Sequence, residues 1–176
     1  MSERQASSRA YERRKGGKIV PALCNVAGTV IILLVIALLL PATVSRFVGY
    51  EVYNVISGSM EPTIPTGSMV FVKAIDPVEI APDDVIAFMS GGSVVTHRVV
   101  KNRSLEGEFV TKGDANEDED INTVPYGSLI GRVERHVPML GEITAQLASP
   151  LGKIYMFAFL LCGVLFNVLA GRLRDN

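Results

Sequence analysis

A serine set among small residues is the first feature of the sequence that could support chemistry. Ser59 lies in the window Ser57–Ser68, which reads Ser-Gly-Ser-Met-Glu-Pro-Thr-Ile-Pro-Thr-Gly-Ser. The small residues at 57–59 let a substrate backbone approach the hydroxyl, and the prolines that follow favour a rigid turn. Serines beside glycine are also common in ordinary loops, so Ser59 is a candidate nucleophile that needs support from a base.

One of the two histidines is placed to be that base. His97 lies in the strand-like run Val94–Val100, 38 residues after Ser59. A serine hydroxyl reacts near neutral pH only when a neighbouring group removes its proton, and histidine is the side chain most often used. A lone histidine in a strand is commonly structural, but the candidate nucleophile in the same predicted domain favours a catalytic role. The other histidine, His136, lies among charged residues ahead of an apolar stretch, where a place at a membrane boundary is expected.

An acidic run could supply a third group. The segment Thr111–Asp120 reads Thr-Lys-Gly-Asp-Ala-Asn-Glu-Asp-Glu-Asp. Its composition alone predicts a solvated loop. Alternatively, one of its carboxylates orients the imidazole of His97, fixes its tautomer and stabilises the imidazolium. Both interpretations fit the residues.

The same run has part of the pattern of a calcium loop. Asp114, Asn116 and Asp118 have the one-three-five spacing of the oxygen ligands in such a loop. However, Glu119 stands where the loop needs a glycine, and Pro125 stands where it needs a bidentate glutamate. No metal site is therefore expected.

The residues that follow the candidate nucleophile are apolar and nearly uncharged. They are Met60, Pro62, Ile64 and Pro65. In one interpretation they dip toward a membrane, so that a substrate held in lipid meets the serine at the surface. In the other they pack in the core of the domain. The pattern fits both.

Short runs of β-branched and aromatic residues surround these candidates and predict strands. Turn signals rich in Pro, Gly and Asp separate the runs. No helical period alternates with them. The expected fold class is therefore mainly β, an antiparallel coiled sheet or partly closed barrel. The predicted strands cover residues 50–56, 68–73, 85–88, 94–100 and 108–112.

Two long stretches without charge flank the predicted sheet. They are Ile19–Ser45 and Ile154–Gly171. About 20 apolar residues span a bilayer as a helix, so both stretches are predicted to be transmembrane. A cleaved secretory signal is the alternative for the first, but its apolar core would run only about 7–15 residues. A buried core helix is the alternative for the second, but its residues are apolar all round, which favours lipid.

The distribution of charge predicts the orientation in the membrane. Residues 1–18 hold six Lys or Arg against two Glu, and two Arg follow the second apolar stretch. By the positive-inside tendency, both termini of this multi-pass cell-membrane protein are expected in the cytoplasm. The expected organisation is a cytoplasmic basic tail (1–18), transmembrane helix 1 (19–45), an extracytoplasmic β domain (46–152), transmembrane helix 2 (153–171) and a cytoplasmic tail (172–176).

Composition excludes several other function classes. The 176 residues have a formal net charge of −1, no Trp and no basic patch interleaved with aromatic residues, so nucleic acid is not an expected partner. Cys24 and Cys162 both lie inside apolar stretches, which gives no disulfide framework and no cysteine-based zinc site. No cofactor is expected. The lipid bilayer is the expected partner of the two helices, and the sequence carries no indication of an oligomeric state.

Three segments together resemble a known family. Ser-Gly-Ser-Met-Glu-Pro (57–62), Thr-His-Arg-Val (96–99) and Thr-Lys-Gly-Asp-Ala-Asn (111–116) resemble, in order and spacing, the conserved boxes of type I signal peptidases. Gly-Arg-Val (131–133) is similar to a further box of that family. The histidine places the resemblance in the endoplasmic-reticulum, archaeal and Gram-positive branch, which uses histidine where the common bacterial branch uses lysine. It covers about residues 30–140.

The resemblance implies a role for each candidate residue. Ser59 matches the nucleophile of the family and His97 its general base. Asp120 matches the aspartate that completes the triad, and Asp114 matches a second aspartate whose role is structural. Ser57 matches the position that adds a hydroxyl to the oxyanion hole, beside the backbone N–H of Ser59. The crowded acidic run leaves the choice between the two aspartates open.

The resemblance also implies the reaction. The expected function is that of a membrane-bound serine endopeptidase that cleaves N-terminal signal peptides from secreted preproteins at the outer membrane face. The reaction would proceed through an acyl-enzyme on Ser59 with His97 as general base. Two alternatives are a protease with the same chemistry dedicated to a narrow substrate, and an inactive membrane-anchored β domain that acts as a scaffold.

Overall fold

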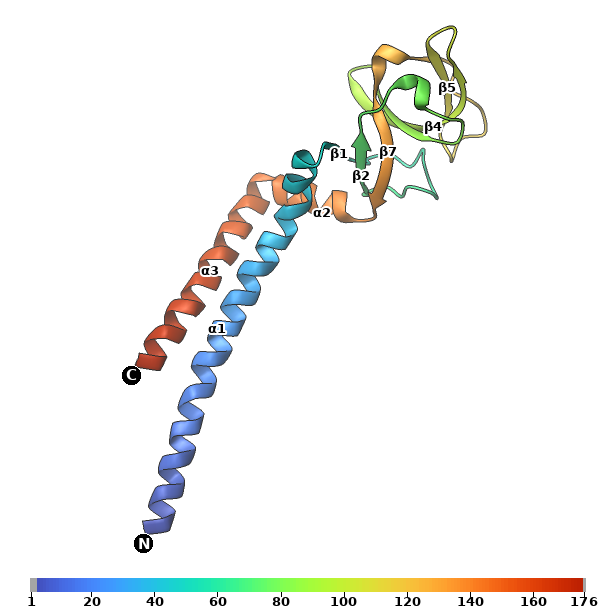
Figure 1. The fold of residues 1–176 in the computed structure, drawn as a ribbon. Helices are drawn as coiled ribbons and strands as arrows, with labels where there is room; N and C mark the ends of the chain where they lie inside the picture. The colour runs from blue at the N-terminus through green and yellow to red at the C-terminus, as the bar shows by residue number, and fades with distance from the viewer. Residues whose placement is uncertain (1–2, 176) are drawn as a thin grey trace. The chain divides into compact units, whose positions relative to one another are not determined.

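The computed structural model describes residues 3–175 of the chain. The chain divides into two compact units (Figure 1). The helical unit comprises Met1–Leu40 and Leu147–Asn176, and the β unit comprises Pro41–Gln146. The β unit therefore contains all of the candidate site residues.

Two long helices make up most of the helical unit. α1 covers Glu3–Phe47 and α3 covers Pro150–Asp175. Within them, Ile19–Leu40 and Pro150–Arg174 are long and apolar enough to cross a membrane. Their 22 and 25 residues correspond to about 33 and 38 Å of helix, against a hydrocarbon thickness of about 30 Å. These stretches overlap both of the predicted transmembrane helices.

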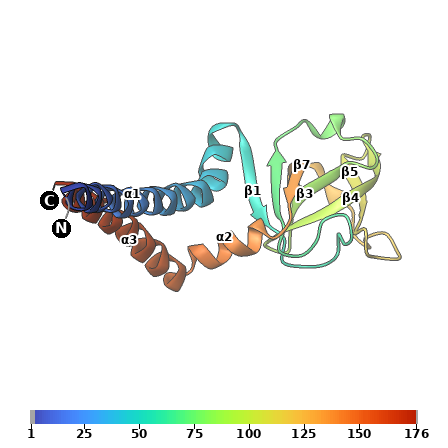
Figure 2. The same cartoon turned by 90° about the horizontal axis from the view of Figure 1, so that it is seen from below.

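Glycines allow α1 and α3 to lie in close contact, side by side and antiparallel (Figures 1 and 2). A Cβ atom added to Gly28 would lie 2.6 Å from the carbonyl oxygen of Gly163. Beside this contact, the Asn167 side chain donates to the same carbonyl at 3.0 Å, and the Thr29 hydroxyl donates to Asn167 at 3.4 Å. Small residues and polar side chains of this kind are typical of helix pairs in lipid.

The β unit is built on one antiparallel sheet of seven strands in the order β1-β2-β7-β3-β4-β5-β6. The sheet is not closed, because its outer strands β1 and β6 each pair with one neighbour. The strands are β1 (Tyr50–Asn54), β2 (Met69–Lys73), β3 (Val85–Ser90), β4 (Ser93–Arg103), β5 (Glu108–Lys112), β6 (Val124–Pro125) and β7 (Leu129–Val137).

The expected antiparallel, mainly β fold is confirmed, and each of the five predicted strands overlaps an observed one. Two strands and three helices were not predicted. β7 lies in the middle of the sheet, where it pairs with β2 on one side and β3 on the other. The other unpredicted elements are β6, a short helix α2 (Leu140–Ala148) and the single 3-10 turns η1 (Pro77–Glu79) and η2 (Tyr126–Ser128).

Two of the apolar residues that follow Ser59 lie in the core of the β unit. Met60 and Ile64 are each 2% exposed and pack in a cluster with Val70, Val72 and Ala87 from the sheet. For these two side chains the core interpretation therefore holds and the membrane interpretation is wrong. Their burial anchors the loop on which Ser59 lies.

Candidate active site

Ser59 lies in the loop between β1 and β2, in a tight turn. The turn is closed by backbone hydrogen bonds from Glu61 to Gly58, at 3.0 Å, and from Ile64 to Met60, at 2.8 Å. Ser59 is half-buried, while Gly58 is exposed. The buried Met60 side chain thus fixes the backbone directly after a serine that solvent can reach.

His97 lies in the middle of β4, and its ring is held from two sides. Its Nδ1 atom is 2.6 Å from Oδ2 of Asp120, and its side chain is 12% exposed. The ring of Phe88 on β3 meets it edge-on, with the two centroids 6.2 Å apart. A carboxylate on Nδ1 favours the tautomer that carries its proton there and leaves Nε2 free to accept one.

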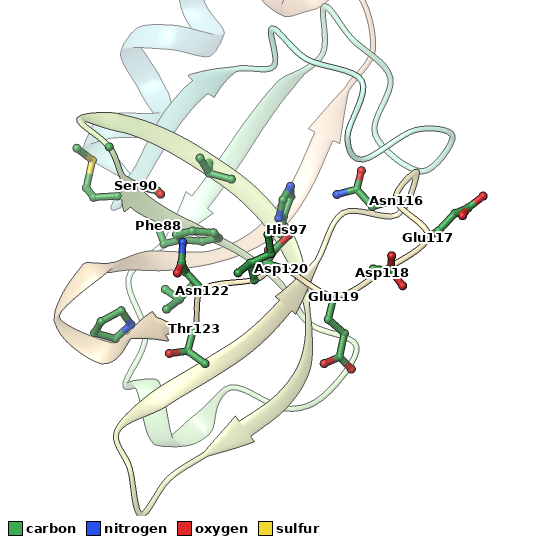
Figure 3. Close-up of a pocket in the computed structure, with 16 residues that line it drawn as sticks. Phe88, Ser90, His97, Asn116, Glu117, Asp118, Glu119, Asp120, Asn122 and Thr123 are labelled. Carbon is green, nitrogen blue, oxygen red and sulfur yellow. Dashed lines mark hydrogen bonds and ion pairs between the residues drawn. The ribbon is translucent and has the colours of Figure 1, made fainter.

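The loop that carries Asp120 is tied back to β5. The Asp120 backbone N–H donates to the carbonyl of Thr111 at 2.8 Å, and the buried Thr111 hydroxyl donates to Oδ2 of Asp120 at 2.6 Å. Figure 3 shows Asp118 and Glu119 pointing away from His97, whereas Asp120 lies against it. The acidic run is therefore both a solvated loop and the source of one carboxylate for the histidine.

Asp114 has a different partner. Its two carboxylate oxygens accept hydrogen bonds from Nε and Nη2 of Arg98, at 2.8 and 2.6 Å, and Arg98 also donates to the carbonyl of Asp83 at 2.7 Å. The Arg98 guanidinium, with the Thr63 hydroxyl, holds the pKa of the Asp114 carboxyl below its usual value. Asp114 thus binds the residue next to His97 on β4.

This ion pair predicts a pH-dependent stability. Asp114→Asn is expected to lower the free energy of unfolding by about 2 kcal/mol at neutral pH, because a charged, bidentate hydrogen bond is lost. Since folding lowers the pKa of Asp114, its contribution is present above the ordinary value of 3.8 and is lost as the pH falls through the lower folded value. Calorimetry of the full chain in detergent at decreasing pH should show the difference from wild type vanishing in acid. Asp118→Asn, at an exposed position, is the control; a difference that persists unchanged in acid would contradict this origin.

The turn that begins with Gly113 is packed against the backbone of Ser59. The Ala115 N–H donates to the Ser59 carbonyl at 2.9 Å, and the Asn116 N–H closes the turn on the Gly113 carbonyl at 3.0 Å. Farther along the loop, the Lys112 ammonium donates to the Glu117 carbonyl at 2.8 Å. The segment that leads to Asp120 therefore also positions the candidate nucleophile.

Gly113 leaves no room for a side chain in this contact. A Cβ atom there would lie 2.7 Å from the Ser59 carbonyl oxygen and 2.8 Å from the Asn116 amide nitrogen. Gly113→Ala is expected to displace the serine and lower kcat by about 10²-fold, as misplacement of about 1 Å does elsewhere. Initial rates with a preprotein substrate test this. Gly127→Ala is the control, since nothing lies within 4 Å of a Cβ there; equal rates in the two variants would contradict the positioning role.

Two cavities both have Val95 in their lining. The smaller, about 460 Å³, is lined by Ser57, Ser59 and other residues of the loop between β1 and β2, together with residues of β1, β2 and β4. The larger, about 940 Å³, is lined by His97, Asp120 and the acidic loop (Figure 3). Ser57 and Ser59 thus face one shared space, as a joint oxyanion role would require.

Three contributors to this arrangement were not identified from the sequence. Thr111 holds Asp120, and Arg98 with Thr63 holds Asp114. Each of the three lies in, or directly after, a segment that resembles a signal peptidase box. That position is the sequence feature that could have identified them. The β unit thus holds a serine that solvent can reach and an imidazole–carboxylate pair. These are the parts needed for nucleophilic catalysis at an acyl group.

Known proteins with similar sequences are signal peptidases. Signal peptidase I W of Bacillus subtilis (strain 168) is 46% identical over 77 residues, 41% of this chain and 40% of that protein. The signal peptidase complex catalytic subunit SEC11C of Homo sapiens is 29% identical over 102 residues, 51% of this chain and 53% of that protein. SEC11 of Lodderomyces elongisporus is 29% identical over 106 residues, 54% of this chain and 64% of that protein. The chain thus spans about half the length of these curated relatives, and no family model matches it.

Proposed function

Because this chain is related to the type I signal peptidases, we propose that it is a membrane-bound serine endopeptidase that removes N-terminal signal peptides from exported preproteins. The observation that carries the proposal is the contact between His97 and Asp120, 2.6 Å long, within the unit that also holds the Ser59 turn. An imidazole oriented by a carboxylate is the base that a serine nucleophile requires.

The proposed reaction forms and then hydrolyses an acyl-enzyme. His97 takes the proton of the Ser59 hydroxyl as Oγ attacks the scissile carbonyl carbon, and Asp120 stabilises the imidazolium. The oxyanion is held by the Ser59 N–H and the Ser57 hydroxyl, each contributing roughly 2.7–4 kcal/mol of barrier lowering. His97 returns the proton to the leaving amine, and then activates the water that releases the signal peptide from the serine.

The smaller cavity suits the residues before the scissile bond. Its lining includes Val55, Ile64, Val70 and Val94, and it lies beside the outer strand β1. An extended peptide can pair with such a strand through its backbone while small apolar side chains enter the cavity. We therefore assign to this cavity a segment of the Ala-x-Ala kind.

The two apolar helices support anchoring in a membrane with the β unit on the outer face. Residues 1–18 carry six Lys or Arg, and Arg172 and Arg174 lie in the last turn of α3, so both termini are assigned to the cytoplasm. A reporter enzyme fused after Asn176 is expected to be active only in the cytoplasm. A second fusion within Glu106–Gly107, in the exposed turn between β4 and β5, should report only outside. The reverse pattern would overturn this topology.

The activity is tested with the full chain purified in detergent and mixed with a labelled preprotein. The expected result is one cut, mapped by mass spectrometry to the bond after the signal peptide, in several unrelated preproteins. Cleavage of a single substrate only would favour the dedicated protease. A folded chain that cuts none of them would favour the scaffold and overturn the proposal.

A further inference from the structure

The larger cavity has no role yet in the proposed reaction. It is an open space of about 940 Å³ whose wall is the loop Asn116–Pro125 and whose other side includes Phe88 and Val95 (Figure 3). It contacts the catalytic pair itself, because His97 and Asp120 both line it. Its size is in the range of cavities that bind ligands.

The direction of proton transfer tells which part of a substrate reaches this cavity. The leaving amine receives its proton from His97, so the nitrogen of the scissile bond must lie at that ring. The proposed oxyanion donors, Ser57 and Ser59, line the smaller cavity instead. A peptide that crosses the serine therefore has the residues before the cut in the smaller cavity and those after the cut beside His97.

The wall of the larger cavity is strongly negative. Glu117, Asp118 and Glu119 are all exposed, and in the described part of the chain none of their carboxylates forms an ion pair. Lys112 bonds the carbonyl of Glu117. The described residues that line the cavity include no Lys or Arg. A peptide in this cavity therefore experiences a negative electrostatic potential. At moderate salt this potential acts over about 10 Å before it is screened.

We propose that this cavity binds the first residues of the segment that follows the cut, and that Glu117, Asp118 and Glu119 make the enzyme discriminate against acidic residues there. The inference rests on the proposed peptidase function. It adds a second binding site on the far side of the scissile bond, with its own charge preference. The same field attracts the new amino terminus, which is a cation at neutral pH once the amine is protonated.

The test compares three preproteins that differ at the second and third residues after the cut, with Lys, Gln or Glu at both. The wild-type chain in detergent is expected to show kcat/KM about three- to tenfold higher for the Gln than for the Glu substrate at low salt, and higher again for Lys. In E117Q/D118N/E119Q the three values should come within about twofold of one another. The control E79Q/E106Q, which removes two exposed carboxylates outside the cavity lining, should keep the wild-type order.

The outcomes separate this inference from the proposed function. If the wild-type chain cleaves the Gln substrate but treats Lys and Glu alike, the cavity assignment is wrong and the peptidase function stands. A preference that survives in E117Q/D118N/E119Q, or that E79Q/E106Q also removes, likewise overturns the assignment. If the wild-type chain cleaves none of the three preproteins, it is the proposed function that fails.

Discussion

Replacing His97 by Ala is expected to lower kcat on the order of 10⁶-fold, the loss seen when a serine protease loses its catalytic histidine. Without the imidazole, nothing in this arrangement removes the Ser59 proton or returns it to the leaving amine. The side chain is 12% exposed and contacts Phe88 and Asp120, so folding of the variant must be checked by calorimetry. Initial rates with a preprotein, in detergent, give the effect.

Two substitutions serve as controls for His97→Ala. His136 is exposed on β7, opposite Val70 of β2, and His136→Ala should keep most of the activity. Lys112 bonds a carbonyl in the acidic loop, and Lys112→Ala should also remain active. Full activity in His97→Ala would mean that the histidine is not the base. Loss of activity in a folded Lys112→Ala would favour the lysine instead.

Asp120→Asn is expected to fold normally and to lose about 10⁴-fold in kcat, the effect of the same change in another serine protease. The amide of Asn can donate to Nδ1, which would move the imidazole proton to Nε2 and leave no base toward the serine. The Thr111 hydroxyl and the backbone bond from residue 120 to Thr111 can both remain, so little stability should be lost.

The neighbouring carboxylates provide matched controls for Asp120→Asn. Asp118 points away from His97 (Figure 3), and Asp118→Asn should be close to wild type in rate and stability. Asp114→Asn should lose stability and part of the rate, because the ion pair between Asp114 and Arg98, the neighbour of His97 on β4, is lost. If Asp120→Asn keeps its rate while Asp114→Asn is folded and inactive, the residue that orients His97 is Asp114.

The strands that hold the candidate residues were predictable because their residues carry local signals. β2, β3, β4 and β5 are runs of Val, Ile, Phe and Thr bounded by Gly, Pro and Asp, and short-range pattern identifies them. β7 was missed because Leu129–Val137 carries Arg132, Glu134 and Arg135, which break any apolar alternation. Its central position depends on pairing with β2 and β3, and Gly131 is needed there, since a Cβ would lie 2.2 Å from the Lys73 carbonyl oxygen.

The partners within the site depended on contacts that sequence spacing does not encode. Asp114 and Asp120 lie six residues apart, and either could have faced His97. The choice follows from how the loop closes: Arg98 takes both oxygens of Asp114, and Thr111 draws Asp120 back to β5. Resemblance to a family indicated the same assignment, whereas composition predicted only a solvated loop.

The central claim is that Ser59 is the nucleophile of a peptidase, and covalent labelling tests it most directly. A peptide ending in Ala-x-Ala, with a reactive phosphonate in place of the scissile carbonyl, is incubated with the full chain in detergent, and the adduct is located by mass spectrometry. The prediction is one adduct on Ser59, absent from Ser59→Ala and strongly slowed in His97→Ala. An adduct on Ser57 or Lys112, or labelling of Ser59 at the same rate in His97→Ala, would contradict the account.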